Sequence, residues 1–297
     1  MTKQRNLWVT RAQDFSKDGW HVRPTVGYEL MFEYLRVSPS YELARKANEE
    51  GLTDEEKAGL PSDFDQVLQT YALLGNVQKV LYRAWWLKRG LKVFGNPYSK
   101  PKTHLLYNLP SGEDVGAGQV SANLSSYLTD IRRNEGLSPA MLVAIPLGIR
   151  RSEIHKQIDA MLAAYEQNET QEELKPQIVL VGKRLRAKVL LNGLRLIWIR
   201  AAKPKWEYWR LGAKAGISKT YSPVLDAGAK RKTTNAIEQV DRDMMTRITY
   251  RAMIKFENIA ENAARGRFPC DDPVEKSDFN YPQLAEIITT KNAWEAK

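Results

Sequence analysis

The sequence predicts a mainly α-helical protein with a minor β component, an α+β class in which helices dominate. Apolar residues recur at helical spacing through most of the 297 residues, with Ser, Thr or Asp before these segments and Gly or Pro after them. Two short apolar runs, "THLLYNL" (103–109) and "AMLVAIPL" (140–147), have the length and composition of strands. The second run precedes a helical pattern and forms the best strand-to-helix unit in the chain.

The first half of the chain is predicted to be a series of helices. Ser38 and Pro39 begin one of them, at the turn where proline is tolerated. Thr53 is placed to cap a short acidic turn, and Asp63 to cap the helix that follows it. Further helices are expected over 76–94, 120–134 and 150–167.

The second half is predicted to contain two main helices. Asn192-Gly193 lies between apolar runs, which is the usual sign of a hairpin, but the residues after it do not alternate at period two. Helical spacing of Leu190, Leu194, Ile197 and Ala201 within 181–203 favours a helix instead. A long amphipathic helix is predicted over 233–265, and its apolar residues near one face are Ile237, Val240, Met244, Ile248, Ala252 and Ile259.

Charge is unevenly distributed along the chain. Of 45 Lys/Arg and 35 Asp/Glu, fourteen basic and two acidic residues lie in 183–232, so this segment carries +12 and the remainder −2. Segregation of this degree indicates a polyanion partner. We expect a mainly helical N-terminal region over 1–170, a basic helical nucleic-acid-binding region over 178–270 and an acidic tail over 271–297.

Composition excludes several classes of protein. No stretch approaches the ~18 apolar residues of a membrane span, and the N-terminus has no secretory signal pattern, so we expect a cytoplasmic protein without membrane contact. Cys270 is the single cysteine, and the three histidines are scattered. We therefore expect no disulfide, no metal and no cofactor.

A helix-turn-helix pattern lies in the basic region. Gly212 allows two helices to approach, Gly216 suits a left-handed turn, Ile217 is placed for the core and Ser218 can cap a second helix. Pro223 falls about five residues into that second helix and removes a backbone hydrogen bond, so the helix is expected to be short, kinked or replaced by a loop. A plain helix–turn corner is the alternative.

Candidate nucleic-acid contacts surround this corner. The expected phosphate contacts near the turn are Lys203, Lys205, Arg210, Lys214 and Lys219. The basic loop "GAKRKTTN" stands before the long helix, whose N-terminus favours anions, and contributes Lys230, Arg231 and Lys232. A solvated linker explains this loop equally well. Tyr221 is the candidate base contact.

Three tryptophans in this region have two possible roles. Trp198, Trp206 and Trp209 can stack on bases or pack in the core. Trp206 and Trp209 are three residues apart beside an apolar segment, and this spacing favours packing.

Four strings, "YLRVSPSYELA", "TYALLGNVQKVLYRAWWLKRG", "KPKWEYWRLG" and "AENAARGRFP", together resemble a loosely characterised family of bacterial proteins often carried on mobile genetic elements. The resemblance spans most of the chain. It implies a DNA-associated accessory or regulatory protein and assigns no catalytic residue.

The sequence therefore favours non-catalytic DNA binding. One alternative is a subunit of a larger ribonucleoprotein or defence complex, in which the basic segment grips RNA or a partner protein. The other is a cryptic metal-dependent nuclease built from scattered carboxylates. No phosphate-binding loop, nucleophile elbow or metal-binding histidine pair is present, and Asp63 and Asp65 are explained by helix capping.

Overall fold

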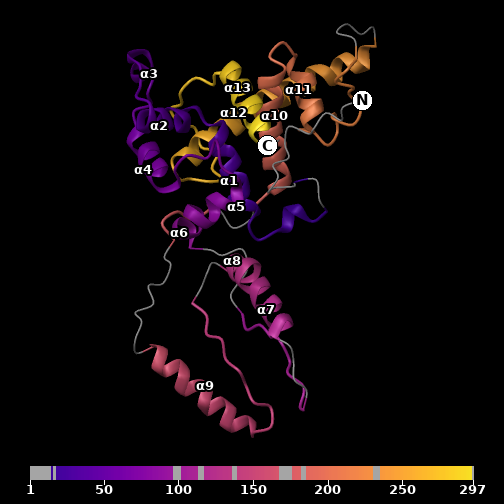
Figure 1. Ribbon diagram of the computed structural model, residues 1–297. Coiled ribbons are helices and arrows are strands. Elements are labelled where there is room, and N and C mark those ends of the chain that lie inside the picture. The colour runs from indigo at the N-terminus through magenta and orange to yellow at the C-terminus, as the bar shows by residue number, and fades with distance from the viewer. Residues whose placement is uncertain are drawn as a thin grey trace. The chain divides into compact units, whose positions relative to one another are not determined.

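A computed structural model describes residues 15, 18–95, 102–112, 117–135, 139–166, 176–181, 185–229 and 235–295 (Figure 1). The chain forms two compact units. Unit 1 contains Met1–Phe94 and Gln177–Lys297, and unit 2 contains Gly95–Pro176. All regular elements in the described residues are helices, as the predicted helical class requires.

The minor β component is not found in the described residues. Residues 103–109 and 140–147 have no regular secondary structure. The large apolar side chains of the second run are exposed, namely Met141, Leu142, Val143, Ile145 and Leu147. A strand is stable only beside a partner that satisfies its backbone groups. The described part of unit 2 offers no such partner, so the apolar run stays irregular.

The first helices of unit 1 begin where capping residues stand. They are α1 (Val26–Val37), α2 (Pro39–Glu49), α3 (Asp54–Ala58) and α4 (Phe64–Leu74). The Ser38 hydroxyl accepts a hydrogen bond from the Tyr41 amide at the start of α2. Thr53 and Glu56 form a reciprocal capping box at the start of α3. The predicted starts at Ser38 and Thr53 are confirmed.

The N-terminal part of unit 1 ends in a cluster of buried aromatic side chains. Helix α5 (Tyr82–Trp85) continues through a wide turn, η2 (Trp86–Gly90), into α6 (Leu91–Phe94). Trp85 and Trp86 are buried, and the Trp85 indole donates to the Leu74 carbonyl at 2.7 Å. A residue larger than Gly90 would not fit here, because a Cβ would lie 2.7 Å from the Trp86 ring.

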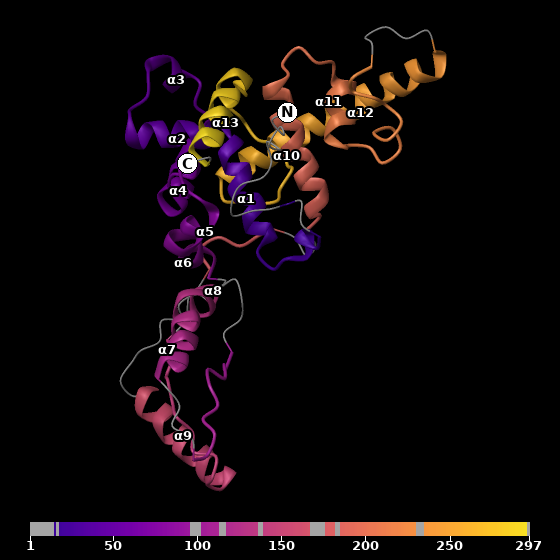
Figure 2. The same ribbon diagram turned by 45° about the vertical axis from the view of Figure 1, so that its right-hand side comes forward.

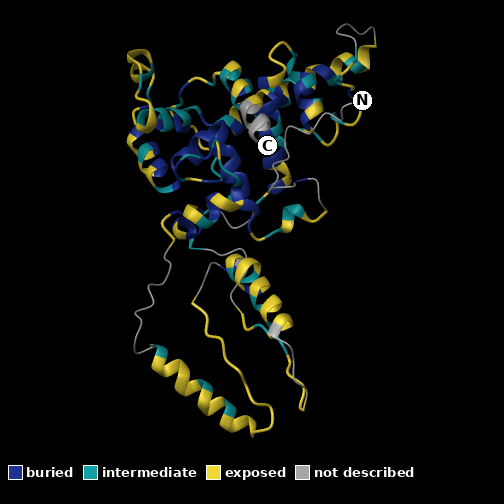
Figure 3. Cartoon of the chain, in the orientation of Figure 1, coloured by how far each residue is buried: buried dark blue, intermediate teal, exposed yellow. Residues whose placement is uncertain are grey.

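Unit 2 is smaller. Helix α7 (Ala117–Ser126) runs through the wide turn η3 (Tyr127–Ile131) into α8 (Arg132–Asn134), and α9 (Arg151–Glu166) follows the irregular apolar run. The side chains of α9 are mostly exposed (Figure 3).

The remaining helices of unit 1 are α10 (Ala187–Ala202), α11 (Tyr208–Ala215), α12 (Ala236–Ala264) and α13 (Tyr281–Glu295). Helix α10 spans the Asn192-Gly193 pair, so the helix predicted in place of a hairpin is confirmed. Helix α12 packs against α1, α10 and α11 (Figures 1 and 2). Helices from both ends of the sequence therefore share one core.

The apolar residues predicted to form one face of α12 differ in burial between the two halves of the helix. Ile259 is buried in the core. Ile237, Val240 and Met244 are exposed, and in this half of the helix the core side is formed by Met245 and its neighbours one turn apart. The helical spacing of the apolar residues was correct, but in the first half of α12 they do not face the core.

Candidate nucleic-acid interface

The corner after α11 has the backbone geometry that its glycine predicts. Gly216 adopts φ 72° and ends the helix. The Ile217 amide donates to the Gly212 carbonyl at 3.1 Å, and the Gly216 amide to the Ala213 carbonyl at 3.3 Å. This is the helix termination that a left-handed glycine permits.

No regular second helix follows the corner in the described residues. The Ser218 hydroxyl accepts from the amides of Thr220 and Tyr221 at 3.3 and 3.2 Å. Two isolated helical hydrogen bonds follow, from the Ser222 amide to the Ser218 carbonyl and from the Leu225 amide to the Tyr221 carbonyl. Pro223 lies between them and has no amide hydrogen. The second helix was expected to be short, kinked or replaced by a loop, and the structure has a turn-rich loop. A complete helix-turn-helix stays a hypothesis.

Trp209 organises the core of this corner. It is buried in a cluster with Leu225 and Met245, against which Ile217 and Tyr221 also pack. Its indole donates to a Glu207 carboxylate oxygen at 2.8 Å. Burial of Trp209 and Trp198, favoured over base stacking, is confirmed, and Trp206 is half-buried.

Gly212 allows α11 and α12 to lie close together. A Cβ at this position would lie 2.7 Å from the Met245 methyl group and would overlap the Thr249 side chain. The small residue predicted for helix approach therefore serves the contact with α12, rather than with a second helix after the turn.

Four of the predicted lysines lie on the surface around α11. Lys203 ends α10, Lys205 lies in the following turn, Lys214 is in the last turn of α11 and Lys219 follows the corner. All four are exposed, and none forms an ion pair with a described residue. Some lysines elsewhere in unit 1 are paired, since Lys46 pairs with Glu56 and Lys57 with Asp54, whereas Lys79, Lys88 and Lys92 are exposed like these four. The four lysines keep their charge available to a phosphate.

The other predicted residues are placed differently. Arg210 has a side chain 14% exposed, pairs with Glu207 and donates to the Ala227 carbonyl at 2.8 Å. Its guanidinium carbon lies 4.6 Å from the centre of the Trp209 ring. Arg210 thus holds the loop after the corner onto α11. Tyr221 is half-buried. Lys230, Arg231 and Lys232 lie outside the described residues.

Lys188 belongs to the same surface but was not singled out from the sequence. The Asn192 side chain donates to the Gly216 carbonyl at 2.9 Å and ties α10 to the corner. Lys188 is exposed and lies one helical turn before Asn192, on the same side of α10. Only the fold brings α10 beside the corner, and the i to i+4 spacing from Asn192 becomes informative once that contact is known.

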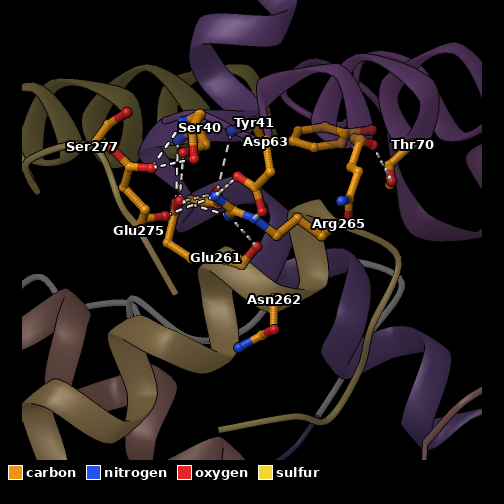
Figure 4. A network of polar contacts seen from close by, with 12 residues as sticks. Ser40, Tyr41, Asp63, Thr70, Glu261, Asn262, Arg265, Glu275 and Ser277 are labelled. Atoms are coloured by element: carbon orange, nitrogen blue, oxygen red, sulfur yellow. Dashed lines mark hydrogen bonds and ion pairs between the residues drawn. The ribbon is translucent and has the colours of Figure 1, made fainter. Parts of the chain in front are cut away.

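A carboxylate cluster lies elsewhere in unit 1, around Arg265 (Figure 4). Arg265 donates to both oxygens of Asp63 at 2.6 and 2.7 Å and to the Glu275 carbonyl at 2.7 Å. It also pairs with the fully buried Glu261 at 3.2 Å. Glu261 accepts from the hydroxyls of Ser38 and Ser40.

This cluster is a structural ion-pair network that joins α12 to α2 and α4. Asp63 stands at the N-cap of α4 but makes no side-chain cap, so the capping role expected for it was wrong. Hydrogen bonds from Arg265 lower the pKa of the Asp63 carboxyl, and hydrogen bonds from Ser62 lower that of Glu275. In the described residues no group of three or more His, Cys, Asp or Glu side chains is arranged for a metal ion.

Unit 2 contains a cavity of about 380 Å³, lined in part by His104, Tyr127, Arg132 and Glu135. His104 and Glu135 are paired, with 2.6 Å between Nε2 and Oε1. Lining residues of this kind can bind a small polar molecule. The phosphate contacts expected from the sequence belong to unit 1.

Comparison with known proteins gives no match: no protein-family model, no curated protein and no solved structure matches the chain. No described helix combines the length and the apolar composition needed to cross a bilayer.

Proposed function

We propose that the protein binds DNA without catalysis, through phosphate contacts made by the lysines around α11. The observation that carries the proposal is the exposure of Lys203, Lys205, Lys214 and Lys219 without an acidic partner among the described residues. Lys188 extends this surface along α10. We refer to these five residues as the lysine surface.

The acidic residues near the lysine surface are already engaged. Glu207 accepts from Trp209 and pairs with Arg210. Asp226 accepts from the Gly228 amide at 2.8 Å in a tight turn. A hydrogen bond leaves the charge of Asp226 unchanged, but residues 203–229 contain five Lys/Arg against two Asp/Glu. The field over α11 is therefore net positive, and a polyanion is attracted before contact. Lys230, Arg231 and Lys232 follow this turn in the sequence and stay a prediction, because they lie outside the described residues.

The lysine surface favours binding that depends little on DNA sequence. Lysine contacts to phosphates position a protein on a duplex but carry no sequence information. The segment after Ser218 is a turn-rich loop instead of a helix that could enter the major groove. Tyr221 packs partly against Trp209, and any base contact by its hydroxyl is secondary to the phosphate contacts.

The biological setting of this activity is part of the proposal. The resemblance of four segments to bacterial proteins carried on mobile genetic elements supports an accessory or regulatory role for such an element. DNA of that kind lies in the cytoplasm, and the absence of a membrane-crossing helix among the described residues is consistent with this location.

The test is a comparison of two sets of four substitutions to glutamine. One variant changes Lys203, Lys205, Lys214 and Lys219, and the matched control changes Lys57, Lys79, Lys88 and Lys92. All eight lysines are exposed in unit 1, so the two variants lose equal charge. Arg210 is left unchanged because it holds the fold.

Fluorescence anisotropy with a labelled duplex measures affinity as salt is varied. Four phosphate contacts contribute a slope of about −3.6 to the logarithm of affinity against the logarithm of salt concentration. We expect the first variant to lose about that slope and the control to keep it. Equal losses would show that total charge alone matters. A wild-type slope flatter than about −2 would reject the proposal, and a preference for RNA of equal length would support the ribonucleoprotein alternative.

A further inference from the structure

Helix α12 carries a row of residues on the side away from its buried face. These residues, the α12 seam, are Ile237, Val240, Met244, Arg247, Arg251 and Ile254, and all are exposed. The exposed fractions are 76% for Ile237, 61% for Val240, 38% for Met244 and 41% for Ile254. The core of unit 1 therefore does not account for these apolar side chains.

The spacing of the α12 seam is that of a helix–helix contact. Its members are separated alternately by three and four residues, which keeps them in one row along a pair of supercoiled helices. The row covers seventeen residue steps, or about 26 Å of helix. A face of this length and period suits another helix better than a compact ligand.

The charges in the seam and beside it are divided by sign. Asp241 and Asp243 lie in the N-terminal half, and Arg247 and Arg251 in the C-terminal half. None of the four forms an ion pair with a described residue, although Gln239 donates to Asp243 at 3.0 Å. Both signs are thus available to a partner that carries the opposite order of charges.

A second copy of α12 in antiparallel orientation has that order. If Ile237 lies opposite Ile254 of the second copy, then Val240 meets Arg251 and Met244 meets Arg247. In the same register Asp243 lies within about 2 Å, along the axis, of the level of Arg247 in the second copy, and Asp241 equally close to the level of Arg251. A parallel pair would instead place like charges together.

We propose that the α12 seam is a homodimer interface formed by two antiparallel copies of α12 related by a two-fold axis. The same surface on both copies is then self-complementary, as a two-fold contact requires. One helix pair of this length is at the small end of specific interfaces, so we expect a dissociation constant of about 1–100 μM. The proposal does not depend on DNA binding.

The test uses two charge-reversed variants of the full chain, Asp241→Arg with Asp243→Arg and Arg247→Asp with Arg251→Asp. Each variant carries four like charges along the seam, so each should sediment as a monomer at concentrations where the wild type dimerises. An equimolar mixture of the two should dimerise again, because each now complements the other. Sedimentation velocity at increasing concentration measures all four samples, namely the wild type, the two variants and their mixture.

Other outcomes would reject the proposal. A wild type that stays monomeric at 500 μM, or variants that dimerise like the wild type, would show that the seam does not pair. A mixture that stays monomeric would reject the antiparallel register. If the variant Arg247→Asp with Arg251→Asp loses DNA affinity and mixing restores no dimer, Arg247 and Arg251 are phosphate contacts instead.

Folding of the variants is checked separately. Circular dichroism should give unchanged helix content for both charge variants, since all four positions lie outside the buried core. A second variant, Ile237→Gln with Val240→Gln, changes the two most exposed apolar positions without altering charge. It should also be monomeric, and a dimer of wild-type strength from this variant would overturn the proposal even if the charge variants fail to fold.

Discussion

At the scale of single residues, Trp209 shows that basic side chains near the corner also stabilise the fold. Its ring packs on Leu225 and Met245, while the guanidinium carbons of Arg210 and Arg242 lie 4.6 and 4.2 Å from its centre. Part of the positive charge in this region is therefore used to stabilise the fold and not to bind a polyanion. Charge in the sequence counts such arginines equally with the free lysines, and only burial separates them.

Replacement of Trp209 by alanine should therefore reduce stability. We expect Trp209→Ala to lower the free energy of unfolding by about 3–5 kcal/mol, because a large buried side chain is lost and a cavity remains. Trp206→Ala, at a half-buried position, should cost clearly less. Urea denaturation measures both. A Trp209→Ala variant that unfolds like the wild type but no longer binds DNA would mean that the ring contacts bases.

Asp63 is the second residue whose role is set by a distant partner. Its bidentate pair with Arg265 is partly exposed, so Asp63→Asn should cost about 2 kcal/mol, less than the 3–5 kcal/mol of a fully buried pair. Asp65→Asn, at an exposed position two residues away, should be nearly neutral. Equal stability of the two variants in urea would show that the network around Arg265 does not contribute to folding.

The same pair predicts a dependence on pH. The pKa of Asp63 is below its ordinary value of 3.8 in the folded protein, chiefly because Arg265 donates hydrogen bonds to it. As pH falls below about 4, the Asp63 carboxyl is protonated in the unfolded chain before it is protonated in the folded protein. The free energy of unfolding therefore decreases until the pH has fallen past the pKa of Asp63 in the folded protein. Asp63→Asn should remove part of this acid sensitivity, as measured by urea denaturation between pH 6 and pH 3. A profile parallel to that of the wild type would contradict the assigned pKa shift.

At the scale of elements, close helix packing depends on glycine. Gly212→Ala places a methyl group against Met245 and Thr249, and we expect a loss of about 1–3 kcal/mol from overpacking between α11 and α12. Gly118, in α7, has open space around it, so Gly118→Ala should be neutral or stabilise by up to about 1 kcal/mol. Thermal unfolding measures both variants. A stabilising Gly212→Ala would mean that the two helices separate at no cost.

The elements that local chemistry determines could be predicted from the sequence. Helix α10 follows its apolar period through Asn192-Gly193, and Ser38 and Thr53 cap the helices that they precede. Features that need a distant partner could not. The run 140–147 lacks a neighbouring strand in the described residues, and Asp63 binds an arginine 202 residues away instead of its own helix.

The candidate site divides in the same way. Exposure of Lys203, Lys205, Lys214 and Lys219 agrees with their polar spacing, whereas Arg210 is held by Glu207 and the Ala227 carbonyl. The exposed side of α12 was hidden from pattern reasoning, because a helical period reveals that an apolar face exists but not what covers it.

At the scale of the whole molecule, the lysine surface and the α12 seam are separate. Helix α11 packs on the buried side of α12, with Gly212 against Met245 and Thr249, and the seam lies on the opposite side of that helix. Two surfaces arranged in this way can act independently, since substitution of one leaves the contacts of the other unchanged.

We therefore expect the two functions to be separable by substitution. The variant with glutamine at Lys203, Lys205, Lys214 and Lys219 should lose affinity for a duplex of about 12 base pairs yet dimerise like the wild type. Ile237→Gln with Val240→Gln should be monomeric but bind the short duplex with unchanged affinity and salt slope, because its charge is unaltered. Anisotropy measures the duplex affinity of both variants, and sedimentation velocity measures their dimerisation. Loss of both properties in either variant would mean that DNA binding and dimerisation use one continuous surface, and the separation inferred from the packing of α11 on α12 would be wrong.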